Sequence, residues 1–363
     1  MTIDQNSNDN RSGSRPTRVF VVDDSVVIRG LVTRWLRETG RFDVVGTAAN
    51  GRIAVENIER FDPEIVLLDI EMPEMDGVTA LPLLLQRKPD LKVIVVSTLT
   101  QRNAEFSVRC LSLGAVDYLP KPESRNLGTS DDFRQELIER LSVHAQSTDR
   151  STDPVGRPSR AHRIRRSIPA RPRVLLIGAS TGGPRAIEQV LLGLGPALKR
   201  IPVLVVQHMP PMFTAVFASH LRMKYGIDAR EGAEGDSPVP GTVLIAPGGR
   251  HMGVTGQATS PVIRLDDGPP MSFCRPAVDF LFRDAAAVFG NAAIATVLTG
   301  MGSDGTMGTR LLVEAGATVI VQDEATSTVW GMPGSIAKAG LAHEVLPLEA
   351  IGPTIASIIG GAV

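Results

Sequence analysis

The stretch Arg173–Ile187, RVLLIGASTGGPRAI, decides the fold of the C-terminal part of the chain. Its apolar run Val174–Ile177 predicts a buried strand, and the small residues Gly178–Gly183 predict a tight turn. Pro184 is expected at the first position of the following helix, because a residue without an N–H loses no hydrogen bond there. The stretch therefore predicts a strand, a turn and a helix in succession.

Ser180 is expected at the carboxyl end of that strand, beside the helix N-terminus and among small side chains. A serine hydroxyl at such a place suits a nucleophile, because the helix terminus favours a developing oxyanion. Gly178–Gly182 also fits the G-x-S-x-G pattern. The alternative is a turn that cradles a phosphate or dinucleotide, although Ser180 stands where G-x-G-x-x-G has its second glycine. This stretch alone leaves both interpretations open.

The composition indicates a globular protein of two domains. The chain has 363 residues, 43% of them hydrophobic, and its net charge of −1 gives no indication of nucleic acid or an anionic membrane as partner. Cys110 and Cys274 suit a reducing compartment. Residues 1–16 lack the apolar core of a signal peptide and predict a disordered tail. No apolar run approaches the roughly 18 residues that span a bilayer, so we expect a cytoplasmic monomer without membrane insertion.

Residues 17–145 predict a first α/β domain. Strand-like and amphipathic segments alternate there, which is typical of a parallel sheet with helices on both faces. The predicted strands are Arg18–Val22, Asp43–Ala48, Ile65–Leu68, Lys92–Val96 and Val116–Leu119. The predicted helices are Val27–Glu38, Ile53–Arg60, Val78–Arg87, Ala104–Leu113 and Asp131–Val143.

Acidic residues follow two of these strands. Asp23 and Asp24 end the first and Asp69 ends the third, so three carboxylates are expected at one edge of the sheet. Their repulsion is relieved by a hard divalent cation, most simply Mg²⁺. One carboxylate is then free to accept a phosphoryl group whose charge the metal and Lys121 neutralise. Asp24 alternatively caps the helix that begins near Val26, but capping accounts for neither Asp69 nor Lys121.

Residues 146–170 predict a linker rich in proline and serine. Six arginines lie between Arg157 and Arg171, and such a basic run can bind nucleic acid or a membrane. No aromatic residue is interleaved with them, as stacking on single-stranded bases requires. A solvated, semi-flexible connection is the favoured interpretation.

Residues 171–363 predict a second, doubly wound and mostly parallel α/β domain. The predicted strands are Val174–Ile177, Val203–Val206, Thr242–Ala246, Ala293–Leu298 and Thr318–Val321. The clearest predicted helices are Met212–Lys224 and Thr306–Ala315.

His208 and Asp304 each follow an apolar strand, as Ser180 does, and parallel strands bring such ends together. A serine nucleophile needs a base, usually histidine, and the histidine needs a carboxylate to orient it. His251 is a rival base and Asp323 a rival carboxylate, and Asp304 alternatively serves only as a helix cap. The chain order Ser, His, Asp differs from that of α/β-hydrolases, so the G-x-S-x-G match does not indicate that fold.

The first domain resembles the receiver domain of response regulators, a (βα)5, flavodoxin-like fold. The resemblance rests on the motifs VVDDS at 21–25, LLDIEMPEMDG at 67–77, VVST at 95–98 and YLPKP at 118–122. It implies that Asp69 is phosphorylated. It also implies that Asp23, Asp24, Asp69 and the carbonyl of Glu71 hold Mg²⁺.

The same resemblance assigns roles around the phosphorylation site. Ser97 is the expected switch hydroxyl, with the adjacent Thr98 as the alternative. Tyr118 is the expected aromatic switch, and Lys121 the lysine that contacts the phosphoryl group.

The second domain resembles the catalytic domain of chemotaxis protein-glutamate methylesterases. The motifs are IGASTGGP at 177–184, VVQHMPP at 205–211, VLIAPGGRHM at 243–252, LTGMGSDG at 298–305 and VWGMPG at 329–334. The resemblance implies Ser180 as nucleophile, His208 as base and Asp304 as its orienting carboxylate. Thr181 and Met301 would line the site, with oxyanion N–H groups near Met301 and His208 and no cofactor in this domain.

The combined resemblances imply a phosphorylation-activated enzyme of chemotaxis adaptation. It would hydrolyse glutamate γ-methyl esters and deamidate particular glutamines on chemoreceptors, with a chemotaxis histidine kinase as phosphodonor. Unphosphorylated, the receiver would cover Ser180. Two alternatives remain: a non-enzymatic, phosphorylation-dependent adaptor, and a nucleotide-binding regulator that uses Gly178–Gly183.

Overall fold

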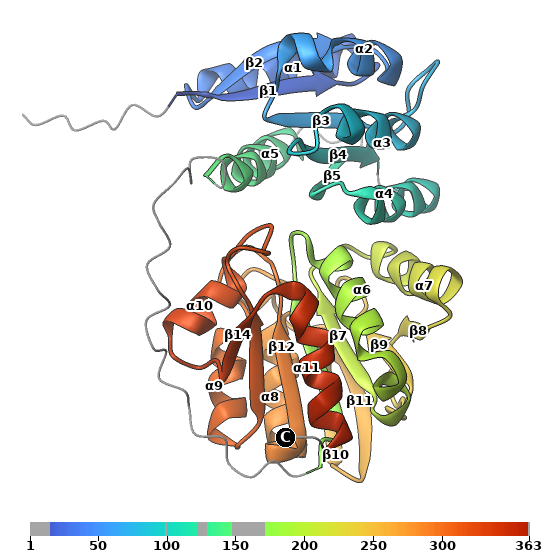
Figure 1. Ribbon diagram of the computed structural model, residues 1–363, viewed down its shortest axis with the longest axis vertical. Coiled ribbons are helices and arrows are strands. Elements are labelled where there is room, and N and C mark those ends of the chain that lie inside the picture. Colours follow the sequence, from blue (N-terminus) through green and yellow to red (C-terminus); the bar gives the residue numbers. More distant parts are fainter. Residues whose placement is uncertain (1–14, 99, 122–128, 147–170, 362–363) are drawn as a thin grey trace, which may run out of the picture.

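The computed structural model describes residues 15–98, 100–121, 129–146 and 171–361. Two α/β domains pack one on the other in this part of the chain (Figure 1). The predicted linker, apart from Gln146 at the end of a helix, and all but two residues of the predicted tail lie outside the described residues. Within the described ranges, no helix has the length and apolar character needed to cross a membrane.

The first domain is a five-stranded parallel sheet with the strand order β2-β1-β3-β4-β5. Its strands are β1 (Thr17–Val22), β2 (Phe42–Ala48), β3 (Ile65–Asp69), β4 (Lys92–Thr98) and β5 (Asp117–Lys121). Its helices are α1 (Val26–Glu38), α2 (Gly51–Phe61), α3 (Gly77–Arg87), α4 (Gln101–Leu113) and α5 (Thr129–Gln146). The predicted (βα)5 fold is therefore confirmed, with most boundaries moved by one to three residues.

Short polar side chains begin several of these helices. The hydroxyl of Ser25 accepts the N–H of Ile28 at 3.3 Å, and Asn50, Asp76 and Thr100 make the same kind of bond at α2, α3 and α4. Such caps satisfy N–H groups that have no partner within the helix. Because Ser25 caps α1, the alternative that Asp24 does so is wrong, and the Asp24 side chain is left exposed.

The second domain is a seven-stranded sheet with the order β14-β13-β12-β6-β7-β9-β8, and every pair in it is parallel. Its strands are β6 (Val174–Ala179), β7 (Val203–Gln207), β8 (Asp228–Glu231), β9 (Thr242–Ile245), β12 (Ala293–Val297), β13 (Thr318–Gln322) and β14 (Glu344–Leu346). An antiparallel hairpin, β10 (His251–Gln257) with β11 (Ser260–Asp266), stands apart from it.

Helices cover both faces of this sheet (Figure 1). They are α6 (Gly183–Leu194), α7 (Phe213–Tyr225), α8 (Val278–Phe289), α9 (Thr306–Glu314), α10 (Met332–Lys338) and α11 (Leu348–Gly360), with 3₁₀ turns at Gly195–Arg200 and Gly290–Ala292. The predicted doubly wound arrangement is thus confirmed. The short strands β8 and β14 and the hairpin were not predicted.

Strand β6 is the centre of this domain. Leu175 and Ile177 contribute to the apolar core on one face of the sheet, whereas Val174 and Leu176 contribute to the core on the other. All four side chains are fully buried, which is why the strand is a continuous apolar run without alternation. The chain winds outward from β6 to β7 on one side and returns to β12 on the other.

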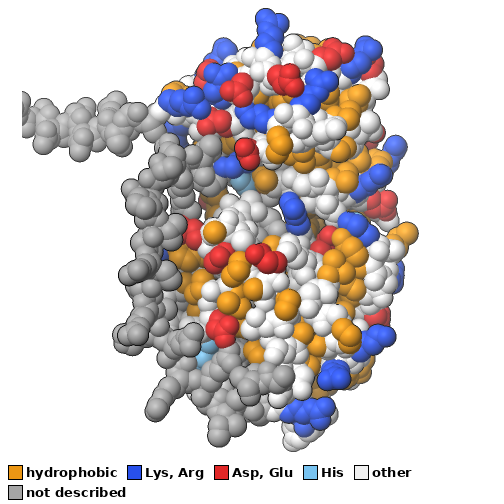
Figure 2. Space-filling model, in the orientation of Figure 1, with side chains coloured by type: hydrophobic (Ala, Val, Ile, Leu, Met, Phe, Trp, Pro, Cys, Tyr) orange, Lys and Arg blue, Asp and Glu red, His pale blue; other side chains and the backbone are white. Residues whose placement is uncertain are grey.

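The two domains meet through α4 of the first and α6 and α7 of the second (Figure 1). The ring of Tyr118 in β5 stacks on Phe213 at the start of α7, with centroids 4.8 Å apart. Ser112 of α4 donates its hydroxyl to Glu188 of α6 at 2.6 Å and lies 2.9 Å from Nε2 of His220. On the face shown in Figure 2, acidic and basic side chains are intermixed over the first domain.

We expect Leu176→Ala to lower the free energy of unfolding of the second domain by about 2–5 kcal/mol, because it opens a cavity beneath the central strand. Urea unfolding of a Trp35→Phe background, in which the fluorescence of Trp330 reports on this domain alone, measures the change.

The matched control is Leu192→Ala on α6, where the side chain is 51% exposed. We expect its effect to stay within about 0.5 kcal/mol. Equal effects of the two substitutions would contradict the central position of β6.

Candidate active site

Three neighbouring strands of the second domain bring the predicted triad to one edge of the sheet. Ser180 directly follows β6, His208 directly follows β7, and Asp304 lies in the turn between β12 and α9. This edge is where the winding of the chain reverses, at the carboxyl ends of parallel strands, and open α/β sheets place their ligands there.

Asp304 holds the imidazole of His208 in a fixed orientation. Its Oδ2 lies 2.8 Å from Nε2 of His208 and accepts the N–H of Val278 at 2.7 Å. Its Oδ1 accepts the N–H groups of Asp279 at 3.0 Å and Gly305 at 2.8 Å. Asp304 therefore does more than cap a helix, because its carboxylate binds both the first turn of α8 and the imidazole of His208.

The electrostatics of this pair favour a charged imidazole. Burial lowers the pKa of His208, but the hydrogen bonds and charges of Asp304 and Cys274 outweigh it and raise that pKa to about 9. Burial likewise opposes ionisation of Asp304, whereas His208 and the N–H groups of Asp279 and Val278 bring its pKa below the ordinary value. At neutral pH the charged form of the imidazole is therefore favoured.

Ser180 is fixed through its backbone. Its N–H donates to the carbonyl of Thr299 at 3.0 Å, and its carbonyl accepts the side-chain amide of Gln207 at 2.9 Å and the N–H of Gly183 at 2.7 Å. Among the described residues, no hydrogen bond joins the hydroxyl of Ser180 to His208. Ser180 is thus positioned by its backbone, without a hydrogen bond from its hydroxyl to the predicted base.

Two glycines make room around Ser180. A Cβ on Gly300 would lie 2.8 Å from the Cβ of Ser180, closer than real contacts allow. Gly182 has a φ of +76°, and its Cβ would meet the hydroxyl of Thr328 at 2.4 Å. Close packing therefore requires glycine at both positions, 182 and 300.

The remaining predicted residues of the site have different surroundings. Thr181 is buried, and its carbonyl accepts the hydroxyl of Thr299 at 2.9 Å, while Met301 is half-buried beside Gly300. The backbone N–H of His208 donates to the carbonyl of Ala179 at 3.1 Å. This N–H already has a partner, and the expectation that N–H groups near Met301 and His208 bind an oxyanion stays a prediction.

The rival residues have structural roles. Nδ1 of His251 accepts the N–H of Ala277 at 3.2 Å and its Nε2 lies 3.1 Å from the carbonyl of Pro269, so both nitrogens are occupied. Oδ1 of Asp323 accepts the N–H and the hydroxyl of Thr326 and so closes a turn. No hydrogen bond in the described part of the chain joins either residue to Ser180 or His208.

Three residues at the site were not predicted. Sγ of Cys274 lies 3.6 Å from Nδ1 of His208. Asp279 accepts the N–H of Gly308 at 2.7 Å, and its pKa is raised to about 6 by burial and by the neighbouring charge of Asp304. Gln207 is buried behind Ser180 and donates to its carbonyl. Only Gln207, at the carboxyl end of an apolar strand, carried a sequence signal that could have identified it.

The predicted acidic cluster is present in the first domain. Ligand oxygens of Asp23, Asp24 and Asp69 lie within 4.8 Å of one another. Nζ of Lys121 lies 2.8 Å from Oδ2 of both Asp23 and Asp69. Burial raises the pKa of Asp69 to about 6, Lys121 opposes this, and Asp23 and Asp24 add to it. One lysine thus leaves part of the repulsion among the three carboxylates unrelieved. Their oxygen donors fit a divalent cation such as Mg²⁺. The carbonyl of Glu71 as a further ligand stays a prediction.

The two candidates for the switch hydroxyl differ in their partners. Ser97 is buried with its Oγ 2.9 Å from that of Ser107 in α4, whereas Thr98 is exposed and accepts the side-chain amide of Asn103 at 2.6 Å. Tyr118 is buried at the domain interface, where burial raises the pKa of its hydroxyl. The choice between Ser97 and Thr98 stays open.

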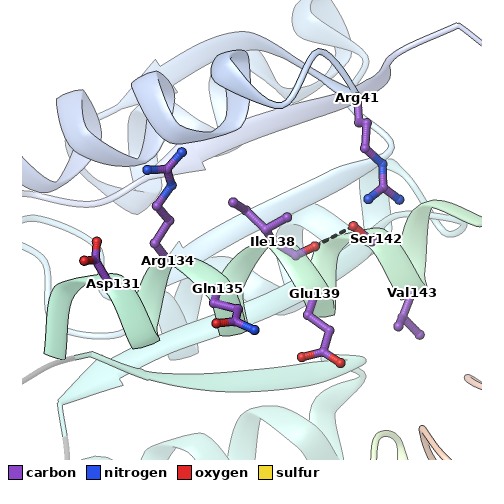
Figure 3. Close-up of a pocket in the computed structure, with 8 residues that line it drawn as sticks. All are labelled: Arg41, Asp131, Arg134, Gln135, Ile138, Glu139, Ser142 and Val143. Atoms are coloured by element: carbon purple, nitrogen blue, oxygen red, sulfur yellow. Dashed lines mark hydrogen bonds between the residues drawn. The ribbon is translucent and has the colours of Figure 1, made fainter.

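The first domain also covers Ser180 and His208. A small cavity of about 50 Å³ is lined by Ser180, His208 and neighbouring residues of the second domain. On its other side it is lined by Leu111, Asp117, Tyr118 and Arg140. A larger hollow of about 590 Å³ lies along α5 beside Arg41 (Figure 3), and none of the predicted site residues lines it.

Comparisons with known proteins agree with this two-part organisation. Residues 175–355 match the CheB methylesterase family and residues 19–129 match the response regulator receiver domain. The chain is 47% identical to a protein-glutamate methylesterase/protein-glutamine glutaminase of Rhodopseudomonas palustris, over 97% of this chain and 96% of that protein. It is 46% identical to another from Caulobacter vibrioides, over 94% and 98% of the two chains.

A solved structure has the same fold as the second domain. The CheB methylesterase catalytic domain of Thermotoga maritima is 38% identical and has a TM-score of 0.50, over 52% of this chain and 98% of that one. Fold and site define a two-domain protein in which a receiver is joined to an α/β hydrolytic domain. The chain belongs to the family of protein-glutamate methylesterase/protein-glutamine glutaminases, known as CheB.

We expect Asp304→Asn to lower the pKa of His208 well below about 9, because the variant removes the negative charge that stabilises the imidazolium. NMR titration of the His208 ring measures the change. Asp323→Asn, which alters a turn carboxylate, is the control and should leave this pKa in place. An unchanged titration in Asp304→Asn would show that Asp304 does not govern the imidazole.

Proposed function

We propose that the chain hydrolyses γ-methyl esters of glutamate side chains on chemoreceptors and deamidates particular glutamines there. The supporting observation is the His208–Asp304 pair, held at 2.8 Å at the strand edge where Ser180 also lies. The names of the relatives describe both activities. A histidine kinase of the chemotaxis type is the proposed phosphodonor for the receiver.

The orientation of His208 decides which nitrogen acts as base. Because Nε2 faces Asp304, Nδ1 is the nitrogen left to accept the proton of Ser180. Oγ of Ser180 attacks the ester carbonyl, and the proton passes to Nδ1. The tetrahedral intermediate then collapses, its C–O bond breaks, and Nδ1 returns the proton to the leaving methoxide to give methanol.

A second half-reaction releases the enzyme. Water gives a proton to Nδ1 of His208 and attacks the acyl group on Ser180, and collapse frees the glutamate carboxyl and restores the serine hydroxyl. For a glutamine side chain the same steps release ammonia in place of methanol. The N-terminus of α6 supplies a favourable field for the oxyanion, and Thr181 and Met301 are the proposed lining of its binding place.

Regulation by the receiver is proposed from the contact between the domains. Leu111, Tyr118 and Arg140 line the cavity of about 50 Å³ that contains Ser180 and His208, so the receiver restricts access to these two residues. Asp23, Asp24 and Asp69 are the residues that would hold Mg²⁺, which when bound supplies positive charge for phosphoryl oxygens. Lys121, now paired with Asp23 and Asp69, would turn to the phosphoryl group on Asp69.

Phosphorylation can loosen the domain contact because the site around Asp69 and this contact share strand β5. Lys121 ends β5, and Tyr118 of the same strand stacks on Phe213. Phosphorylation acts by making the undocked arrangement more favourable than the docked one. The contact is thus the proposed two-state element.

We expect Ser180→Ala to reduce methanol release from methylated receptor fragments by roughly ten-thousandfold or more, the order lost when a triad member is removed. Ser219→Ala on α7, remote from the triad, is the matched serine control.

A small-molecule phosphodonor should raise the activity of the wild type and leave that of Asp69→Asn unchanged. Wild-type protein that accepts phosphate on Asp69 but releases no methanol would support the adaptor alternative instead.

We expect Ser112→Glu to raise the activity of unphosphorylated protein toward its phosphorylated level. The new carboxylate would face buried Glu188, and two like charges at this contact repel one another. Methanol release without phosphodonor measures the effect, and Asn57→Glu on α2, away from the interface, is the control. Basal activity that is equal in both variants would argue against the interface as the control element.

A further inference from the structure

Cys274 occupies a place in the active site that the proposed reaction does not use. Its Sγ lies 3.6 Å from Nδ1 of His208, the nitrogen that is proposed to receive the serine proton. Sγ, the imidazole of His208 and an oxygen of Asp304 all lie within 4.8 Å of one another. Thiolate and imidazole are donors that zinc prefers in proteins.

The separation of sulfur and nitrogen matches one edge of a tetrahedral zinc site. Zinc–sulfur bonds of about 2.3 Å and zinc–nitrogen bonds of about 2.0–2.1 Å, at a tetrahedral angle, place the two ligand atoms about 3.6 Å apart. Sγ of Cys274 and Nδ1 of His208 are already 3.6 Å apart. The spacing of these two ligand atoms therefore suits a metal ion.

Asp304 supplies the supporting contact such a site needs. Histidines that bind zinc through one nitrogen usually donate the other N–H to a carboxylate, which fixes the ring. Nε2 of His208 has this partner at 2.8 Å, and the carboxylate is itself held by the N–H groups of Val278, Asp279 and Gly305. The imidazole is thus oriented for a metal at Nδ1.

The turn that carries Cys274 is also well defined. Met271 and Cys274 exchange two backbone hydrogen bonds, of 3.1 and 2.8 Å, around Ser272 and Phe273. Arg275, the next residue, donates its guanidinium to the carbonyls of Asp267 and Gly268. Cys274 is half-buried and so remains within reach of solvent ions.

We propose that Cys274 and His208, supported by Asp304, form a binding site for Zn²⁺ that inhibits the hydrolase. The metal displaces the thiol proton of Cys274 and the Nδ1 proton of His208, both of which pass to solvent, and its other positions are left to water. With Nδ1 coordinated, Ser180 has no base. The inhibition rests on the proposed function, whereas the binding site does not.

Cobalt substitution tests the site without reference to activity. Co²⁺ added to the full-length protein should give a thiolate-to-metal charge-transfer absorption that Zn²⁺ abolishes. Cys274→Ser should lack the absorption and bind Zn²⁺ roughly a hundredfold or more weakly, since even indirect ligand contacts are worth 10- to 100-fold. Cys110→Ala removes the other cysteine, which is fully buried in the first domain, and should leave both properties unchanged.

Activity provides the second measurement. Zn²⁺ should inhibit methanol release by the wild type and by Cys110→Ala, and a chelator should restore it. Circular dichroism of Cys274→Ser verifies that the variant is folded. Absence of the charge-transfer band in wild type, or a band that persists in Cys274→Ser, would overturn the site, and full activity of zinc-saturated wild type would overturn the inhibition. If the wild type releases no methanol even without metal, the proposed function fails while the cobalt spectrum still decides the site.

Discussion

The hydrogen bond between Asp304 and His208 is the interaction on which the rest of the site depends. It joins the turn after β12 to the end of β7 across β6, and so connects three neighbouring strands at their carboxyl ends. The same carboxylate holds the first turn of α8, which makes its geometry a property of the fold. In the resulting orientation Nε2 of His208 faces Asp304, and Nδ1 lies 3.6 Å from Sγ of Cys274.

Much of this arrangement was predictable because parallel α/β sheets leave a strong signal. Fully buried strands such as Val174–Ala179 are continuous apolar runs, and each functional residue follows such a run directly or after a short turn. The hairpin β10–β11 and strand β8 (Asp228–Glu231) were missed since glycines interrupt the first and charged residues dominate the second. Cys274 lies on a turn 66 residues from His208, and no local sequence pattern predicts a contact between two residues so far apart in the chain.

The receiver introduces a second constraint, since the site is formed by one domain and covered by the other. Tyr118 on Phe213 and Ser112 on Glu188 are contacts between domains that neither domain's pattern predicts. Burial raises the pKa of Asp69 to about 6, and the hydrogen bonds and charges of Asp304 and Cys274 outweigh burial and raise that of His208 to about 9. A cation bound beside Asp69 would favour its ionised form, as Asp304 favours the charged form of His208.

Labelling with a fluorophosphonate tests the central claim most directly, because the reagent reacts only with a serine that a neighbouring base activates. Peptide mass mapping of the full-length protein, with and without a small-molecule phosphodonor, locates the adduct. The account predicts a single adduct on Ser180 that forms faster with phosphodonor and is lost in His208→Ala. An unlabelled Ser180 in phosphorylated protein, or equal labelling in His208→Ala, would contradict it.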